Sequence, residues 1–267
     1  MEHEILSKDL IPQPELWRCA IVIERSRLDV ALFPPVESER LIHRTILLNR
    51  DASSHTKAVQ EAVYANPLLL SDFTRIDVLT DTGDFCIVPR ETARSVDAGE
   101  IFAAAKADLT GKSAEIAHAT EHISVAFALD TPLAGFIRRT FFNVHLSHIL
   151  APVIANPPAD TALFAECSQE KVLVTATAGG KLIFANIFHC DCPEDATYFI
   201  TAVSRSLPEK NLPVILTGNA PYTDTVREYL TRYVDEPHRY DVNPVLASLG
   251  EDSLTLPQPL TALLSCE

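Results

Sequence analysis

Glycine is scarce in this chain and makes up only eight of its 267 residues. Glycine-rich loops let a backbone approach a phosphate group closely, so their absence removes a common way of holding a nucleotide. The sequence has no P-loop, no G-x-G-x-x-G string and no G-x-S-x-G nucleophile elbow. These absences argue against the standard mononucleotide, dinucleotide and serine-hydrolase sites.

Basic residues are also few, with 22 Lys and Arg against 36 Asp and Glu, and the formal net charge is −14. Nucleic acids and anionic membranes both attract basic surfaces. No cluster of Lys and Arg stands out along the chain. We therefore expect neither nucleic acid nor an anionic membrane as a main partner.

Long apolar runs are absent as well, and none reaches the roughly 18 residues that a membrane helix needs. Residues Met1–Glu4 are acidic and no basic, then apolar, leader follows them, so we expect no signal peptide and no membrane insertion. The six cysteines are scattered, and several lie in apolar segments, as reduced core cysteines do. We expect a cytoplasmic protein.

The most informative stretch that is present runs from residue 163 to residue 219. Apolar, β-branched segments alternate with turn signals there, and Gly179-Gly180 suits a two-residue hairpin turn. Pro193 suits a first helical position behind a cap at Asp191 or Cys192. The stretch predicts three strands, a helix and a fourth strand, at Leu163–Ala165, Lys171–Thr177, Lys181–His189, from Pro193, and Leu212–Thr217.

The first half of the chain repeats this order of elements. It predicts three strands and a helix that begins at Ser53 or Ser54, with bounds 17–24, 28–33, 39–49 and 53–65. Further strands and helices are predicted at 123–129, 131–139, 142–147 and 148–155, and in the second half at 223–234, 239–242 and 244–249. Both halves therefore have the order βββαβαβα, which indicates an internal duplication.

An additional module interrupts the first half. Strands at 75–80 and 85–89, a helix capped by Asp97 and a strand at 116–122 predict a small ββαβ insertion at about 74–122. The predicted organisation is a first half at 1–156 that contains this insertion, a second half at 157–250 and a tail at 251–267.

This layout resembles the actin-like ATPase, or ribonuclease-H-like, fold, an α/β architecture of two similar halves with mixed sheets. The resemblance covers about residues 17–250. The insertion is similar in placement to the extra subdomain of bacterial pilus-assembly and cell-division actin relatives. The length and layout resemble a little-characterised bacterial family with a degenerate version of this fold.

In active members of the fold, the first hairpin turn of each half carries an Asp-x-Gly phosphate loop, and paired glycines end the strand beside the adenosine. Here the turns at 24–27 and 166–169 contain no glycine, and a single glycine follows the strand at 212–217. The resemblance thus implies a degenerate nucleotide cleft whose remaining candidates are Glu24, Ser26, Glu166, Ser168, Gly218 and Asn219. We expect no catalytic residue and no cofactor, with retained binding of ATP and Mg²⁺ as the alternative.

Two further strings contain metal-ligating residue types. His118-Ala119-Thr120-Glu121-His122 matches H-x-x-E-H, which binds zinc only on a helix. The apolar segment after it favours a strand, where the two His would lie about 13 Å apart, too far for one Zn²⁺. His189-Cys190-Asp191-Cys192 has no second cluster to complete a zinc site, and it is typical of a helix cap beside a buried cysteine. A lowered pKa at Cys192 is the alternative.

The sequence therefore predicts a non-catalytic scaffold or protein-interaction module, with a protein partner and with residues 74–122 as the partner surface. The alternative is an atypical nucleotide-binding switch or small-molecule kinase. A third hypothesis is a zinc enzyme at His118–His122.

Overall fold

A computed structural model describes residues 5–35, 40–240, 250 and 256–264. The chain divides into two compact units, one comprising Met1–Pro152 with Val245–Leu260 and the other Val153–Pro244 with Thr261–Glu267. The division lies just before the predicted joint at Asn156–Pro158. Within the described ranges, no helix is both long enough and apolar enough to cross a membrane.

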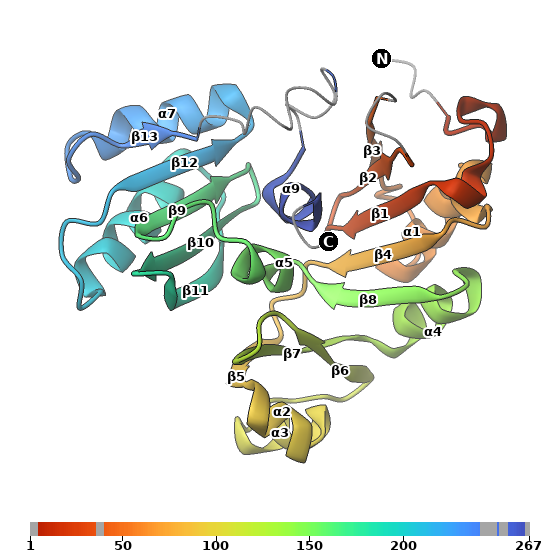
Figure 1. The fold of residues 1–267 in the computed structure, drawn as a ribbon, viewed down its shortest axis with the longest axis horizontal. Coiled ribbons are helices and arrows are strands. Elements are labelled where there is room, and N and C mark those ends of the chain that lie inside the picture. Colours follow the sequence, from red (N-terminus) through yellow and green to blue (C-terminus); the bar gives the residue numbers. More distant parts are fainter. Residues whose placement is uncertain (1–4, 36–39, 241–249, 251–255, 265–267) are drawn as a thin grey trace. The chain divides into compact units, whose positions relative to one another are not determined.

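The first unit is built on a five-stranded mixed sheet with the order β3-β2-β1-β4-β8 (Figure 1). Strands β1 to β3 pair antiparallel, whereas β4 and β8 continue the sheet parallel to β1. In β1 and β2 every residue after the first is buried, as expected for strands covered on both faces. The five strands are β1 (Arg18–Ile23), β2 (Arg27–Phe33), β3 (Ile42–Leu47), β4 (Arg75–Thr80) and β8 (Val144–His148).

Two helices of this unit, α1 and α4, contact each other through Tyr64 and Phe136, whose rings meet edge to face at 5.9 Å. Helix α1 begins where the Oγ of Ser54 accepts a hydrogen bond from the backbone N–H of Lys57 at 3.1 Å. The helices are α1 (His55–Tyr64) and α4 (Thr131–Thr140), and short 3-10 turns span Lys8–Leu10, Pro14–Leu16 and Pro67–Leu70. Helix α5 (Leu150–Ala155) contains the point at which the chain passes from one unit to the other.

A separate three-stranded antiparallel sheet lies between β4 and α4 in the chain, with the order β5-β7-β6. Ile101 and Phe102 of its longer helix pack on Ala126 and Ala128 of the central strand. The elements are β5 (Phe85–Pro89), α2 (Arg90–Ser95), α3 (Ala98–Ala104), β6 (Lys112–His118) and β7 (Ile123–Asp130).

The insertion is present, but its predicted strand membership was wrong at both ends. Strand β4 pairs with β1 and β8 in the main sheet, whereas β7, predicted for the main sheet, pairs with β5 and β6. Both segments are apolar and β-branched, so each satisfies the pattern of a buried strand. Which sheet each joins depends on long-range pairing that local sequence does not encode. Helix α2 was not predicted.

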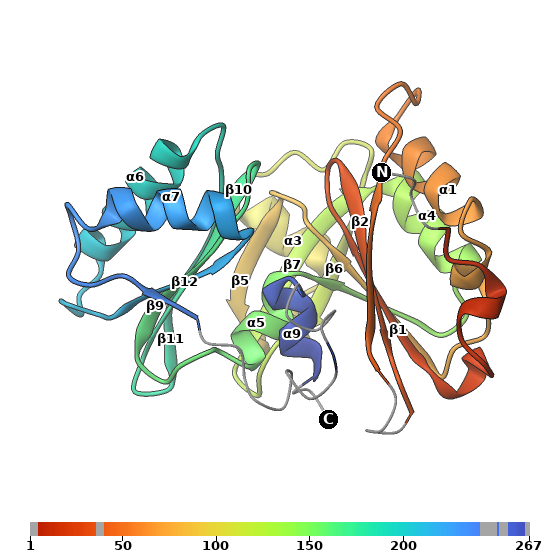
Figure 2. The ribbon, with the colours of Figure 1, turned by 90° about the horizontal axis from the view of Figure 1, so that it is seen from above.

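The second unit repeats the topology of the main sheet, with the strand order β11-β10-β9-β12-β13 and the same alternation of antiparallel and parallel pairs. Figure 2 shows α6 and α7 on one face of this sheet. The elements are β9 (Ala162–Cys167), β10 (Lys171–Ala178), β11 (Lys181–His189), α6 (Pro193–Ser206), β12 (Val214–Gly218), α7 (Ala220–Leu230) and β13 (His238–Arg239).

The predicted duplication is therefore confirmed at the level of topology. The Gly179-Gly180 turn is confirmed too, since both glycines have positive φ. Of the predicted elements near the end of the chain, the helix at 244–249 and the second half of the strand at 239–242 lie outside the described residues. The predicted tail contains a helix that the sequence did not suggest, α9 (Gln258–Leu264), with Leu260, Ala262 and Leu263 buried.

Candidate functional site

The first hairpin turn, between β1 and β2, is closed by its own contacts. The backbone N–H of Glu24 donates to the carbonyl oxygen of Arg27 at 3.0 Å. The Arg27 Nε lies 2.6 Å from Glu24 Oε2, and the Glu24 side chain is 9% exposed. The carboxylate predicted near a Mg²⁺ position is therefore paired with a guanidinium of the same hairpin. Ser26 lies in this turn, and its carbonyl oxygen accepts from the N–H of Leu48.

Asp29 extends this pairing into β2 and was not among the predicted residues. Its Oδ2 lies 2.8 Å from Arg27 Nε, its Oδ1 accepts from Thr45 Oγ1 at 2.6 Å, and the His43 ring lies 3.4 Å away. Burial alone would raise the pKa of Asp29, but the His43 ring, the Arg27 guanidinium and the Thr45 hydroxyl together hold that pKa below its usual value.

Asp77 in β4 is a second buried carboxylate of this kind. It is fully buried and accepts from Arg18 Nε at 2.8 Å and Arg75 Nη2 at 2.7 Å, with His145 Nδ1 at 3.1 Å. Burial alone would raise the pKa of Asp77, but His145 and the arginines outweigh it and lower the pKa. Because Arg18, Arg75 and His145 of the same sheet already pair with it, this carboxylate has a structural role.

A sequence signal for both carboxylates exists. Arg27-Leu28-Asp29-Val30 and Arg75-Ile76-Asp77-Val78 share one pattern, in which Arg and Asp stand two residues apart in a β-branched strand. Residues i and i+2 of a strand point to the same face, so the Arg reaches its own strand's Asp. An Asp inside an apolar strand with Arg two positions earlier therefore predicts a buried pair.

The second hairpin turn lies two residues later than predicted. Glu166 and Cys167 belong to β9, and the turn runs from Ser168 to Lys171, whose carbonyl oxygen accepts from both the N–H and the Oγ of Ser168. The last strand pairs before the turns are Ile23 with Leu28 and Cys167 with Val172. Ser168, not Glu166, thus occupies the place of Glu24. The turn was predicted too early because Glu166, a polar residue near the end of a strand, resembles a loop residue.

The packing of the backbone explains, without a ligand, why position 218 is a glycine. Gly218 pairs with Cys167 at the end of β12 and has φ of +119°. A Cβ atom built there would lie 2.0 Å from the carbonyl oxygen of Cys167. Asn219 follows as the exposed N-cap of α7 and makes no side-chain cap hydrogen bond. The four candidates of the second unit thus gather at the carboxyl ends of β9 and β12, while Glu24 and Ser26 belong to the first unit.

The H-x-x-E-H string spans a hairpin turn. Strand β6 ends at His118 and β7 begins at Ile123, so the prediction of a strand through His122 was wrong beyond His118. His118 Nδ1 lies 2.9 Å from Ser124 Oγ, and its pKa is lowered by burial and by the nearby Arg90 and Arg94. No group of three or more His, Cys, Asp or Glu in the described part of the chain is placed to hold a metal ion.

Glu121 and His122 instead line a pocket of about 630 Å³ in the insertion, together with residues of α2 and its N-cap, namely Pro89, Arg90, Glu91 and Arg94. Arg90 is anchored by a hydrogen bond from Nη1 to the carbonyl oxygen of Thr120 at 2.9 Å. Its Nε is buried and finds no hydrogen-bond partner in the ranges that the structure describes. The pocket is lined by charges of both signs.

The His189–Cys192 string is a helix cap beside a buried cysteine, as predicted. Cys192 is the N-cap of α6, and the Asp195 carboxylate accepts from the backbone N–H groups of Asp191 and Cys192. Cys190 is buried, and burial raises the pKa of its thiol to about 12. The pKa of Cys192 is also raised: the Asp195 backbone N–H lowers it, but partial burial and the Glu194 and Asp195 carboxylates outweigh that effect.

Two units of one topology, each with three antiparallel strands extended by parallel strands, define an actin-like ATPase fold. A Bacteroides thetaiotaomicron protein with this fold and unknown function matches with a TM-score of 0.79 at 15% identity, over 96% of this chain and 98% of that one. The cytoplasmic domain of EpsL, an inner-membrane component of the Vibrio cholerae type II secretion system, matches with a TM-score of 0.51 at 11% identity, over 90% and 96%.

A chain of the PilM–PilN type IV pilus biogenesis complex is similar to the same extent, with a TM-score of 0.52 at 12% identity over 92% of each chain. The family described as "Protein of unknown function (DUF3822)" matches residues 18–236, so the chain belongs to that family. No curated protein matches the sequence.

Proposed function

We propose that this protein is a non-catalytic, cytosolic protein-interaction module built on an actin-like ATPase fold. The observation that carries the proposal is the first hairpin turn. It contains no glycine, and its carboxylate, Glu24, is paired with Arg27 at 2.6 Å. A phosphate group needs free backbone N–H groups and a close approach, and a turn closed on its own ion pair offers neither.

Gly218 supports the same proposal. It is the only glycine left among the candidate nucleotide contacts, and the close approach of the Cys167 carbonyl oxygen explains it without a nucleotide. A cytosolic location is supported by Cys19, Cys86, Cys167, Cys190 and Cys192, which are all free thiols.

The insertion is the proposed partner surface. Helix α2 and the turn between β6 and β7 form the pocket lined by Arg90, Arg94, Glu121 and His122, where the buried Arg90 Nε has no hydrogen-bond partner among the described residues. Unpaired buried donors are costly, and a partner that supplies an acceptor would remove that cost. The similar fold of the PilM–PilN complex and of EpsL adds support by analogy alone.

Calorimetric titration with ATP and Mg²⁺ tests the non-catalytic part. We expect no saturable heat at millimolar nucleotide and no release of phosphate. The informative variant is Asn219→Arg, which places a long cation at the exposed end of β12. Its control is Glu228→Arg, which introduces the same side chain on the exposed side of α7. Hydrolysis of ATP that Asn219→Arg abolishes and Glu228→Arg preserves would contradict the proposal.

A nucleotide-dependent switch or kinase is the second candidate. The observation that favours it is the gathering of Ser168, Gly218 and Asn219 at the carboxyl ends of β9 and β12, the edge where open α/β sheets bind ligands. This candidate predicts a rise in melting temperature with ADP. An unchanged melting temperature at millimolar ADP removes it.

The interaction part is tested by capture from a native lysate with the wild-type protein and with Arg94→Glu as baits. We expect a partner that wild type retains and Arg94→Glu loses, because the substitution reverses one charge of the insertion pocket. Equal recovery by both baits would place the partner elsewhere on the protein.

A further inference from the structure

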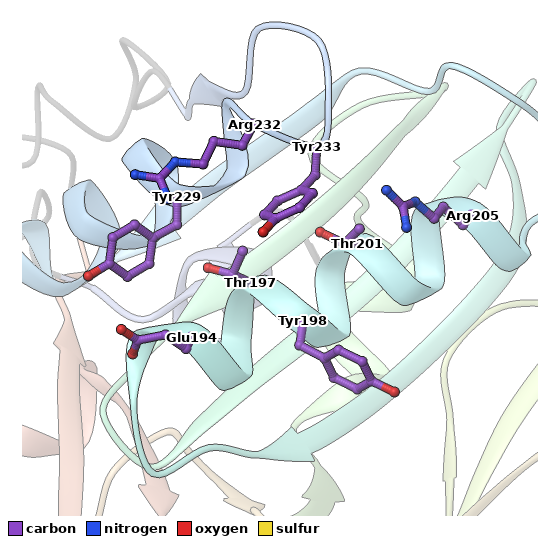
Figure 3. A pocket seen from close by; sticks show the side chains of 8 residues that line it. All are labelled: Glu194, Thr197, Tyr198, Thr201, Arg205, Tyr229, Arg232 and Tyr233. Atoms are coloured by element: carbon purple, nitrogen blue, oxygen red, sulfur yellow. The ribbon is translucent and has the colours of Figure 1, made fainter.

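A groove of about 550 Å³ lies between α6 and α7 on the second unit (Figure 3). Three of the six tyrosines of the chain line it, and two arginines stand at its rim. In Figure 3, Tyr233 lies above the strip of α6 that carries Thr197 and Thr201, and Tyr198 projects from the outer side of the same helix. The residues that matter for recognition are Tyr198, Thr201, Arg205, Tyr229, Arg232 and Tyr233.

The corresponding helices of the first unit are packed differently. Helices α1 and α4 meet through Tyr64, which is edge-on to Phe136, a ring that is only 3% exposed. Tyr64 itself is 59% exposed, so its exposure does not differ from that of Tyr198, at 67%, and Tyr233, at 53%, in the second unit. The difference between the two pairs of helices lies in the number of aromatic side chains: Tyr64 is the one tyrosine before residue 153, whereas three tyrosines line the groove of the second unit.

The floor of the groove holds an unsatisfied polar group. Thr201 is 9% exposed, and its buried Oγ1 has no hydrogen-bond partner within the described part of the chain. One turn earlier on the same helix, the hydroxyl of Thr197 donates to the carbonyl oxygen of Pro193 at 2.8 Å, as helical threonines commonly do. A buried hydroxyl without a partner costs free energy, which a ligand that bonds to Thr201 would recover.

The charge at the groove points to the chemistry of that ligand. Arg205 and Arg232 are exposed, and neither forms an ion pair within the described ranges; Arg232 stacks over the Tyr229 ring at 5.9 Å. Glu194 is the acidic residue of the lining and stands at the opposite end of α6 from Arg205. Two guanidinium groups thus border an aromatic groove on a chain whose net charge is −14.

We infer that the α6–α7 groove docks an acidic segment of a partner protein. Tyr and Arg are among the residue types enriched at the energetic centres of protein interfaces, and Arg pairs with carboxylates in two parallel hydrogen bonds. Carboxylates of the segment meet Arg205 and Arg232, its apolar side chains lie on the tyrosines, and one polar group reaches Thr201. This inference rests on the proposed interaction function and names the chemistry of a partner.

The test uses the full chain and three short fluorescein-labelled peptides that share their apolar positions and differ in carrying Glu, Gln or Lys at the others. Fluorescence anisotropy should show the Glu peptide binding about tenfold more tightly than the Gln peptide, and the Lys peptide not binding. Reversal of both charges, Arg205→Glu with Arg232→Glu, should lower the affinity for the Glu peptide about tenfold or more. Added salt should also lower the affinity of the wild-type protein for the Glu peptide.

Two variants serve as controls. Arg227→Glu makes the same change at an exposed position of α7 outside the groove and should leave the affinity unchanged. Thr201→Val keeps the shape of the side chain and removes only the hydroxyl. It should lower the affinity for the Glu peptide severalfold, while the variant still shows a thermal unfolding transition.

Three results would overturn the inference: no binding of any peptide, equal binding of the Glu and Lys peptides, or equal loss in the Arg227→Glu control. None of these affects the proposed non-catalytic function, which fails only if ATP is bound and hydrolysed. Conversely, ATP hydrolysis by a protein whose groove still selects the Glu peptide would refute the proposed function and leave the groove assignment intact.

Discussion

At the level of single residues, Gly218 shows how backbone packing can require a glycine that also stands in a ligand-binding position. Its positive φ and the nearby Cys167 carbonyl oxygen leave no room for a Cβ atom. We expect Gly218→Ala to lower the free energy of unfolding by roughly 3 kcal/mol, because β12 must shift away from β9. Urea unfolding monitored by circular dichroism measures this change in the free energy of unfolding.

Gly83 provides the matched control for Gly218. A Cβ atom at Gly83 would meet nothing within 4 Å, so Gly83→Ala should change the unfolding free energy by less than about 0.5 kcal/mol. Equal effects of the two substitutions would show that the Cys167 contact does not limit position 218.

Asp29 gives the protein a pH-dependent stability. Because its partners lower its folded-state pKa, the stabilisation is complete above the usual aspartate pKa of about 4 and is lost as pH falls through the lower folded value. Asp29→Asn should therefore cost roughly 3 kcal/mol at pH 7, and the gap from wild type should shrink below about pH 4. Urea midpoints measured across this range test the prediction.

The exposed Asp72 is the control for Asp29. Asp72→Asn should stay within about 0.5 kcal/mol of wild type, since it breaks no buried pair. A gap between wild type and Asp29→Asn that stays constant from pH 7 to below pH 4 would argue against the ion pairs as its cause.

At the level of elements, the two adjacent serines at the start of α1 have different roles. Ser54 accepts the hydrogen bond from the Lys57 N–H and is the N-cap, whereas Ser53 precedes it. We expect Ser54→Ala to lower the unfolding free energy by about 1 kcal/mol and Ser53→Ala to change it far less. Chemical unfolding of both variants measures the difference, and a larger effect at Ser53 would move the cap by one residue.

At the level of the whole molecule, each unit has its own core with a fully buried cysteine in an equivalent strand. Cys19 lies in β1 and Cys167 in β9, and burial raises the pKa of both thiols. We expect iodoacetamide to modify the half-buried Cys86 and Cys192 in the native protein, and Cys19 and Cys167 only on unfolding. Mass spectrometry of peptides from a urea series measures this for each site.

The same experiment shows whether the units unfold together. Each core should lose its protection in one cooperative step. Rapid modification of Cys19 or Cys167 in native buffer would contradict the burial of that core.

Local signals were sufficient to predict many elements of this chain. The bounds of β4, β5 and β11 follow from apolar runs between turn residues, the β10–β11 turn from Gly179-Gly180, and the start of α6 from Pro193 behind its cap. The order of elements in the two halves then sufficed to recognise the duplication and the fold. These features depend on neighbours within a few residues, whose chemistry is written in the chain.

Features that depend on distant residues were not accessible in this way. The exchange of β4 and β7 between sheets, the two-residue offset of the second turn and the pairing of Asp29 with His43 and Thr45 arise from strand register. The α6–α7 groove likewise arises only when two successive helices, separated in the chain by β12, pack on one sheet. Apolar strands of equal quality can pair with several partners, and the free energy of the assembled core selects among them.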